Sequence, residues 1–389
     1  MTSVANESTS SGTIAVSAIA PSHDNRGSWI PNGAMIKTKI MELRKRRGLM
    51  AALIVVNIGV PTIFLLVRLI AHAVAPKSYG PAGGYAIYTD LVAGVMYVFG
   101  FIVAATLGCT AGSSDLTDGM FRHSVITGRS RLALYFARIP AGLAIVVPLV
   151  AVGFTIVCAV CVFAAPTQLN YQGVNIPPGL TATGFNHWAA DHPKEVICGL
   201  PYNGPEGVPC FINGHGKVVV GGKSFPPGAP TFKTMSHTQI ETLAVKVAKQ
   251  NYADYARTFL YPSNALMIRT GLWIELEAII GLIVGLGLAS LMGQRTVPVV
   301  LMIVLEVILT PIFSRTPIAH LINVQRGLVG LATDHLEPGG LPHAFGGGNG
   351  PGQVAQLVPE SRTVAVLVIV AWLVGWTALG AWRMVKRDA

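Results

Sequence analysis

Charged side chains are scarce in this chain of 389 residues, where Asp, Glu, Lys and Arg together make up 12%. An average soluble domain carries about 25% charged residues, so the deficit argues against a soluble cytosolic enzyme. A disordered chain is excluded as well, because disorder requires low hydrophobicity and high net charge. Acidic residues are the scarcer sign, with 18 Asp and Glu against 28 Lys and Arg. Long apolar runs interrupt the basic excess, which is typical of charge that flanks a membrane and not of a nucleic-acid surface.

A nucleotide-binding loop is also lacking. The nearest string, Gly216 to Ser224, has one residue too many between its glycines and its lysine to wrap a phosphate. We interpret the glycine-rich run from Gly346 to Gly352 as a flexible linker. No Ser/His/Asp grouping has a catalytic spacing, and His215, His237 and His343 do not have the spacing of metal ligands. The sequence therefore predicts no catalytic residue, metal or cofactor in this chain.

What the chain has instead is hydrophobicity, with 51% hydrophobic residues and a mean hydropathy of +0.54. A membrane-spanning helix needs about 20 mostly apolar residues, because lipid cannot satisfy exposed peptide groups. Six segments meet this requirement: 49–75, 88–110, 139–165, 266–291, 297–314 and 363–382. The sequence thus predicts an all-α polytopic membrane protein with six transmembrane helices.

The distribution of Lys and Arg predicts the orientation of these spans, because short cytoplasmic segments are enriched in both residues. Basic residues cluster before the first span, between the second and third spans, after the fourth and at the chain end. Both termini are therefore expected in the cytoplasm, and the protein is expected in the cytoplasmic membrane. This orientation places the long loop between spans three and four outside the cell.

Five regions follow from these spans. They are a disordered cytoplasmic tail (1–34), a basic interfacial helix on the anionic lipid surface (35–47), spans one to three (48–165), an extracytoplasmic loop domain (166–265) and spans four to six with an outer loop at 315–361 (266–389). In the loop domain, apolar residues from Ile240 to Phe259 recur at helical spacing, and Thr238 with Glu241 predicts a capping box.

The link between spans two and three, residues 112–131, carries the most specific pattern. Its serines can cap a short helix, its acidic residues lie at the positive helix end, and Gly128 ends it. Three apolar side chains would then project into the cytosol, which suits docking into a groove of a partner. A capped, solvated link between two spans is the alternative. The residues assigned to coupling are Asp115, Asp118, Gly119, Met120, Phe121, Arg122, Val125, Gly128, Arg129 and Arg131.

This link resembles the coupling segment of type-2 ABC transporter permeases. An acidic residue, a glycine, an arginine and then Gly-Arg-Ser-Arg precede the third span, as they do in that family. The six-span layout and the basic segment before span one add to the resemblance. It implies an exporter subunit that pairs with a second permease copy, identical or different. It also implies a separate ABC ATPase subunit that binds ATP and Mg and moves the cytoplasmic helix.

Charged residues inside spans are costly and are therefore functional candidates. These are Arg68 in span one, Glu275 and Glu277 in span four, and Glu306 in span five. They can line a translocation path as a polar patch in which Arg68 pairs with a carboxylate, relay protons, or form a structural ion pair between packed helices. The sequence leaves these three interpretations open.

Small residues and cysteines give further expectations. Gly281, Gly285 and Ala289 recur every four residues and predict close helix packing, either within the chain or between two copies. Cys198 and Cys210 share the predicted outer loop, where an oxidising environment favours a disulfide. The Cys-x-x-Cys in span three and Cys109 are expected to pack as small apolar residues.

The favoured function is the membrane-spanning permease subunit of an ABC-type exporter that works by alternating access. The alternatives are a proton-coupled secondary transporter that uses the intramembrane glutamates, or a membrane-anchored sensor or immunity protein whose outer loop binds a ligand. The sequence does not indicate the substrate.

Overall fold

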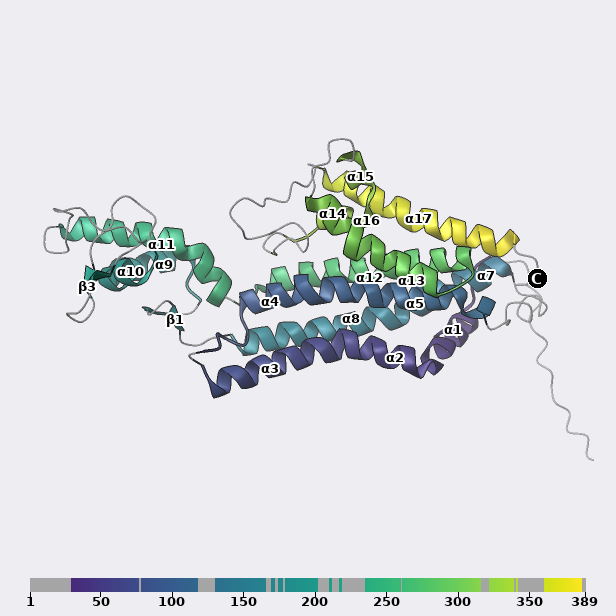
Figure 1. The fold of residues 1–389 in the computed structure, drawn as a ribbon, viewed down its shortest axis with the longest axis horizontal. Helices are drawn as coiled ribbons and strands as arrows, with labels where there is room; N and C mark the ends of the chain where they lie inside the picture. Colours follow the sequence, from purple (N-terminus) through teal and green to yellow (C-terminus); the bar gives the residue numbers. More distant parts are fainter. Residues whose placement is uncertain are drawn as a thin grey trace, which may run out of the picture.

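The structure, a computed structural model, describes residues 29–386 apart from 77, 118–129, 166–168, 172–173, 178, 202–209, 212–216, 219–234, 260, 316–321, 339–340 and 342–359. Within these residues, six long helical rods run side by side, and a smaller lobe lies beyond one end of them (Figure 1). Each rod is long and apolar enough to cross a membrane. The prediction of a six-helix, multi-pass membrane protein is therefore confirmed.

The first three spans are built from several helical segments each. Span one comprises α2 (Arg47–Ile54), the π-helix η2 (Val55–Gly59) and α3 (Val60–Val74). Span two comprises α4 (Tyr85–Leu91), η3 (Val92–Met96) and α5 (Tyr97–Thr117). Span three comprises α7 (Arg131–Phe136) and α8 (Arg138–Phe163).

The last three spans follow the lobe. Span four is the single helix α12 (Asn264–Met292). Span five comprises α13 (Thr296–Ile303), η5 (Val304–Leu309) and α14 (Thr310–Arg315). Span six is α17 (Arg362–Lys386).

A nearby proline explains two of the π-helical segments, η2 and η5. Pro61 follows η2 and Pro311 follows η5, each as the second residue after the segment. A proline cannot donate to the carbonyl four residues earlier, and its ring clashes with that carbonyl. The carbonyl groups four residues before Pro61 and Pro311 belong to Asn57 and Val307. Both residues lie inside the π-helical turns. Such wide turns are frequent at functional sites.

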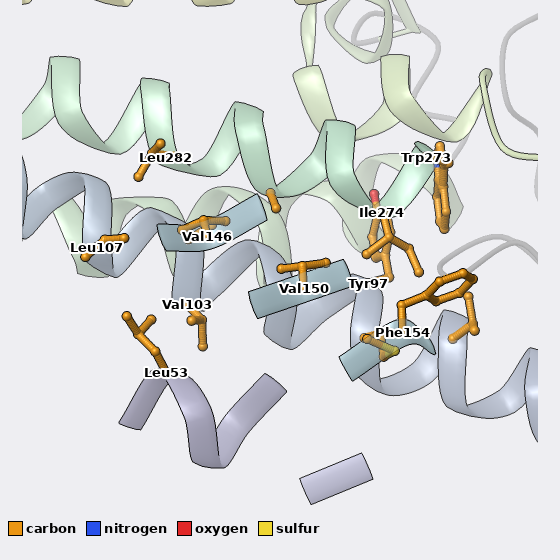
Figure 2. Close-up of a cluster of buried hydrophobic side chains, with 14 of the residues drawn as sticks. Leu53, Tyr97, Val103, Leu107, Val146, Val150, Phe154, Trp273, Ile274 and Leu282 are labelled. Carbon is orange, nitrogen blue, oxygen red and sulfur yellow. The ribbon is translucent and has the colours of Figure 1, made fainter. Parts of the chain in front are cut away.

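Helix α12 lies at the centre of the bundle. In its most apolar window 72% of the residues are buried, against 22% in spans one, five and six. Glycines allow α5 to approach it closely: a Cβ on Gly108 would lie 2.1 Å from the Leu282 carbonyl oxygen, and one on Gly285 would lie 2.7 Å from that of Ala105. Figure 2 shows Leu53, Val103, Val150 and other side chains of the first four spans gathered in one apolar cluster.

Part of the predicted outer loop at 315–361 turns back into the bundle. It contains α15 (Ile322–Gly327) and α16 (Val329–Asp334), and all six residues of α16 are buried. In the apolar cluster that holds α16, Val284, Met302 and Ile369 come from spans four, five and six. The sequence analysis did not predict this insertion.

Helix α1 (Gly33–Lys45) covers most of the segment 35–47, for which the sequence predicts an interfacial helix. Met35 and Leu43 are buried against the bundle, whereas Lys37 and Lys45 are exposed. In Figure 1, α1, α7 and the end of α17 lie at the end of the bundle opposite the lobe. Arg131 joins two of these elements, because its Nη1 donates to the Val385 carbonyl oxygen across 2.8 Å.

The lobe has a hydrophobic core of its own. It contains α9 (Ala182–Asp191), α10 (Pro193–Gly199), α11 (His237–Phe259) and two short antiparallel hairpins. The hairpins pair β1 (Leu169–Tyr171) with β2 (Val174–Ile176), and β3 (Cys210–Phe211) with β4 (Lys217–Val218). The rings of Phe185 and Tyr255 stack at 4.6 Å between α9 and α11.

The start of α11 corrects one expectation. The capping box is formed by Ser236 and Gln239: the Ser236 Oγ accepts from the Gln239 N–H at 3.3 Å, and Gln239 Oε1 accepts from the Ser236 N–H at 2.9 Å. The predicted pair of Thr238 and Glu241 was wrong, because both residues already lie inside the helix. Glu241 instead pairs with His237, whose Nδ1 lies 3.0 Å away.

Candidate functional site

Three acidic side chains meet in the interior between spans two, four and five. Glu277 comes from α12, Glu306 from the wide turn η5, and Asp334 from the end of α16. Their exposed fractions are 1%, 0% and 4%. Glu277 lies within electrostatic reach of both Glu306 and Asp334. We refer to Glu277, Glu306 and Asp334 as the acidic cluster.

The acidic cluster has few hydrogen-bond donors. The Tyr97 hydroxyl faces all three carboxyl groups and donates to Asp334 Oδ1 across 3.2 Å. Two neighbouring threonine hydroxyls donate to backbone carbonyls, Thr310 to Leu305 at 3.0 Å and Thr333 to Gly330 at 2.8 Å, and the Thr333 hydroxyl also lies within hydrogen-bond reach of Glu277. Both Glu306 oxygens and Oε1 of Glu277 accept no hydrogen bond.

Tyr97 is held in place by an aromatic stack. Its ring lies 4.7 Å from that of Trp273, at an interplanar angle of 14°. The indole Nε1 of Trp273 donates to the Thr333 carbonyl oxygen at 3.0 Å and so ties α12 to α16. Figure 2 shows Tyr97 and Trp273 at the edge of the apolar cluster. Packing thus fixes the position of the Tyr97 hydroxyl, which donates to the acidic cluster.

The electrostatics of the acidic cluster are unfavourable for ionised carboxylates. Among the described residues, no Lys, Arg or His side chain forms an ion pair with any of the three. Burial, with Glu306 and Glu337 nearby, raises the pKa of Asp334 well above its usual range. No group of three His, Cys, Asp or Glu residues in the described ranges is arranged to hold a metal ion. The geometry suits carboxyl groups that bind protons.

The other two charged candidates lie apart from the acidic cluster. Glu275 is half-buried on α12, and its two oxygens have no hydrogen-bond partner. Arg68 in α3 donates from Nη2 to the Pro81 carbonyl oxygen at 3.1 Å. Within the described part of the chain, the expected pairing of Arg68 with an intramembrane carboxylate is not found, because the guanidinium is directed to the loop before span two.

A second feature lies at the base of the predicted coupling segment. The Gly112 carbonyl oxygen of α5 accepts from Arg138 Nη1 of α8 at 2.9 Å and from Ser290 Oγ of α12 at 3.2 Å. Arg138 is 1% exposed. Close by, the Ser114 hydroxyl of α5 donates to Glu42 of α1 at 3.3 Å. We refer to Gly112, Arg138 and Ser290 as the three-helix junction.

Only part of the coupling segment lies within the described residues. Asp115 is in the last turn of α5, and Arg131 begins α7. The other predicted coupling residues lie outside the described ranges: Asp118, Gly119, Met120, Phe121, Arg122, Val125, Gly128 and Arg129. The three-helix junction therefore lies at the start of that segment, at Gly112, and contains none of the predicted coupling residues.

The small residues of α12 face α5 of the same chain. Cβ atoms on Gly281 and Gly285 would meet the carbonyl oxygens of Phe101 and Ala105, at 2.8 and 2.7 Å. Ala289 lies next to Gly112. Of the two alternatives left open by the sequence, this face supports packing within one chain.

The cysteines divide between the lobe and the spans. Cys198 is disulfide-bonded, and its expected partner Cys210 begins β3, with its side chain outside the described part of the structure. Cys109, Cys158 and Cys161 are free thiols in the spans.

Sequence reasoning missed Tyr97 and Asp334. A tyrosine in an apolar span resembles any aromatic core residue, so its role appears only once the fold is known. Asp334 follows a short apolar stretch, Leu328 to Ala332, which was assigned to an outer loop. An acidic residue directly after such a stretch was the available signal that the segment is buried.

The lobe also carries an open pocket of about 480 Å³ between α9, α10 and the start of α11. Its charged lining combines Asp191, Glu195 and Glu241 with Lys194 and two histidines. Because both signs are present, the lining favours neither an anionic nor a cationic ligand.

No protein-family model, curated protein or solved structure matches this chain. The functional argument therefore depends on the residues of the chain and their geometry.

Proposed function

We propose that this chain is the membrane-spanning permease subunit of an ABC-type exporter. A separate ATPase subunit, which carries ATP and Mg, drives alternating access, and a second permease copy completes the transporter. The resemblance of residues 112–131 to a coupling segment motivates this proposal. The observation that supports it in the described structure is the three-helix junction.

The junction supports the proposal because it connects the coupling segment to three spans. Gly112 lies five residues before the end of α5, at the start of the 112–131 segment that would dock on the ATPase. Hydrogen bonds from Arg138 and Ser290 converge on its carbonyl oxygen. Hydrogen bonds from a charged donor, such as the Arg138 guanidinium, are among the stronger hydrogen bonds in proteins. A displacement of the segment would therefore move α5, α8 and α12 together.

The test separates ATP hydrolysis from transport. In proteoliposomes that contain this chain and its co-purified ATPase, Arg122→Glu and Gly119→Pro are expected to uncouple ATP hydrolysis from transport. Both variants should still insert into the membrane. Lys37→Glu is a matched charge reversal at an exposed position of α1 and should leave coupling unchanged. Wild-type transport in both segment variants would contradict the proposal.

The acidic cluster favours a second candidate, a proton-coupled secondary transporter. Buried carboxyl groups inside spans are typical of proton relays. A protonophore distinguishes the two candidates. Transport that stops on collapse of the proton gradient, while ATP remains intact, would favour the secondary transporter. Transport that continues would favour the exporter.

A further inference from the structure

The acidic cluster shows an imbalance between acceptors and donors. Glu306 is completely buried, and neither of its oxygens has a hydrogen-bond partner. Oε1 of Glu277 is in the same situation on the facing helix. Buried polar atoms without partners are uncommon in folded proteins, so these oxygens require a donor that the neighbouring side chains do not supply.

Among the described residues, no side chain supplies a positive charge to the acidic cluster. The titratable groups that face the acidic cluster are Tyr97 from α5 and Glu337, just after α16. His335, next to Asp334, directs Nδ1 to the Leu331 carbonyl oxygen at 2.7 Å. Helices α13 and α17 contribute Met302, Ile369 and Trp372 to the apolar cluster that also holds α16. Neighbouring negative charges and burial both disfavour ionised carboxylates.

The site has little free space. A Cβ on Gly330 would lie 2.7 Å from Glu306 Oε2 and 2.8 Å from Thr310 Oγ1, so the backbone of α16 packs directly against the carboxyl group. An organic cation therefore does not fit while α16 is in place. A proton requires no space, removes one negative charge and supplies one of the missing donors.

We propose that Glu277, Glu306 and Asp334 form one proton-binding site, in which protons shared between the carboxyl groups hold α16 against α12 and η5. Loss of these protons would leave facing negative charges in a dry interior and would drive α16 outward. This inference goes beyond the exporter proposal and does not depend on it, because a site of this kind is compatible with ATP-driven or proton-driven transport.

The test measures protonation and not transport. Full-length protein in lipid nanodiscs is examined by infrared spectroscopy for the carbonyl band of protonated carboxyl groups. Thermal unfolding is followed in parallel from about pH 6 to about pH 9, well above the ordinary pKa of a carboxyl group. Glu306→Gln should weaken the infrared band. It should also reduce the loss of thermal stability at high pH, because an amide cannot ionise.

A double-mutant cycle shows whether the site is shared. The effect of Glu306→Gln on the pH dependence should be smaller when Glu277→Gln is already present. Glu275→Gln is the matched control on the same helix, and Glu306→Gln should have its full effect in that background. If Glu306→Gln does not fold, Asp334→Asn takes its place in both cycles.

Two results would overturn the proposal. One is an equal effect of Glu306→Gln in the Glu277→Gln and Glu275→Gln backgrounds, which would show that the carboxyl groups titrate independently. The other is stabilisation of the wild type by sodium ions at constant pH and ionic strength, lost in Glu306→Gln, which would show a metal-cation site.

Discussion

The Tyr97 hydroxyl donates to the Asp334 carboxyl group across 3.2 Å, although the two residues lie 237 positions apart in the chain. This bond connects span two to α16. Because Tyr97 also stacks on Trp273 of span four, three separate segments meet at one side chain. These polar contacts add to the apolar packing that holds α16 in the bundle.

Tyr97→Phe tests the importance of this donor. Removing the hydroxyl leaves the buried Asp334 without its donor, which typically costs about 1–3 kcal/mol. We expect a lower midpoint of thermal unfolding in detergent. Tyr135→Phe in span three is the control, because the buried Tyr135 hydroxyl has no hydrogen-bond partner. An equal loss of stability in both variants would show that the Tyr97 hydroxyl has no special role.

Asp334→Asn tests the pH dependence of stability. Because burial and nearby carboxylates raise the pKa of Asp334, the folded protein retains a proton that the unfolded chain has already lost. The stability from this group is therefore present at low pH and falls as the pH rises, by up to about 1.4 kcal/mol per pH unit, until the folded pKa is passed. Asparagine cannot ionise, so unfolding midpoints of Asp334→Asn should fall less from neutral to alkaline pH than those of the wild type. A steeper fall would contradict the assignment.

Gly108→Ala tests the close packing of α5 on α12. The new methyl group would lie 2.1 Å from the Leu282 carbonyl oxygen, so the helices must separate. Overpacking of this kind typically costs about 1–3 kcal/mol. The yield of monodisperse protein after detergent extraction should fall. Gly100→Ala, in the same helix, meets nothing within 4 Å and should be tolerated. Normal extraction of Gly108→Ala would show that this contact is easily relaxed.

Cys198→Ser tests the disulfide of the lobe. Loss of a native disulfide typically costs about 2–5 kcal/mol in a small extracellular domain. Limited proteolysis should therefore cut the lobe of this variant faster than that of the wild type. Cys109→Ser, which alters a free thiol in a span, is the control. Equal cleavage rates in Cys198→Ser and the wild type would show that the disulfide does not stabilise the lobe.

Hydropathy was sufficient to predict the spans but not what lies between them. Apolar runs near 20 residues have one stable solution in lipid, so each predicted segment overlaps an observed helix. The α16 segment is too short to be recognised in this way. Its burial depends on contacts with Val284 and Met302, which are distant in sequence.

For the candidate site too, the sequence predicted some of the residues, whereas their arrangement depends on the fold. Glu277 and Glu306 were selected from the sequence because charges inside spans are rare. Their proximity to each other and to Asp334 depends on tertiary packing, as does the lack of a basic partner among the described residues. One of the open interpretations paired Arg68 with a carboxylate, but its guanidinium donates to the Pro81 carbonyl oxygen.

The central claim is that residues 112–131 dock on a separate ATPase. The most direct test is to extract the tagged, full-length protein in mild detergent and identify the proteins that remain bound. The account predicts an ATPase with a phosphate-binding loop, recovered with the wild type and lost with Arg122→Glu. Wild-type protein that binds no ATPase would contradict it.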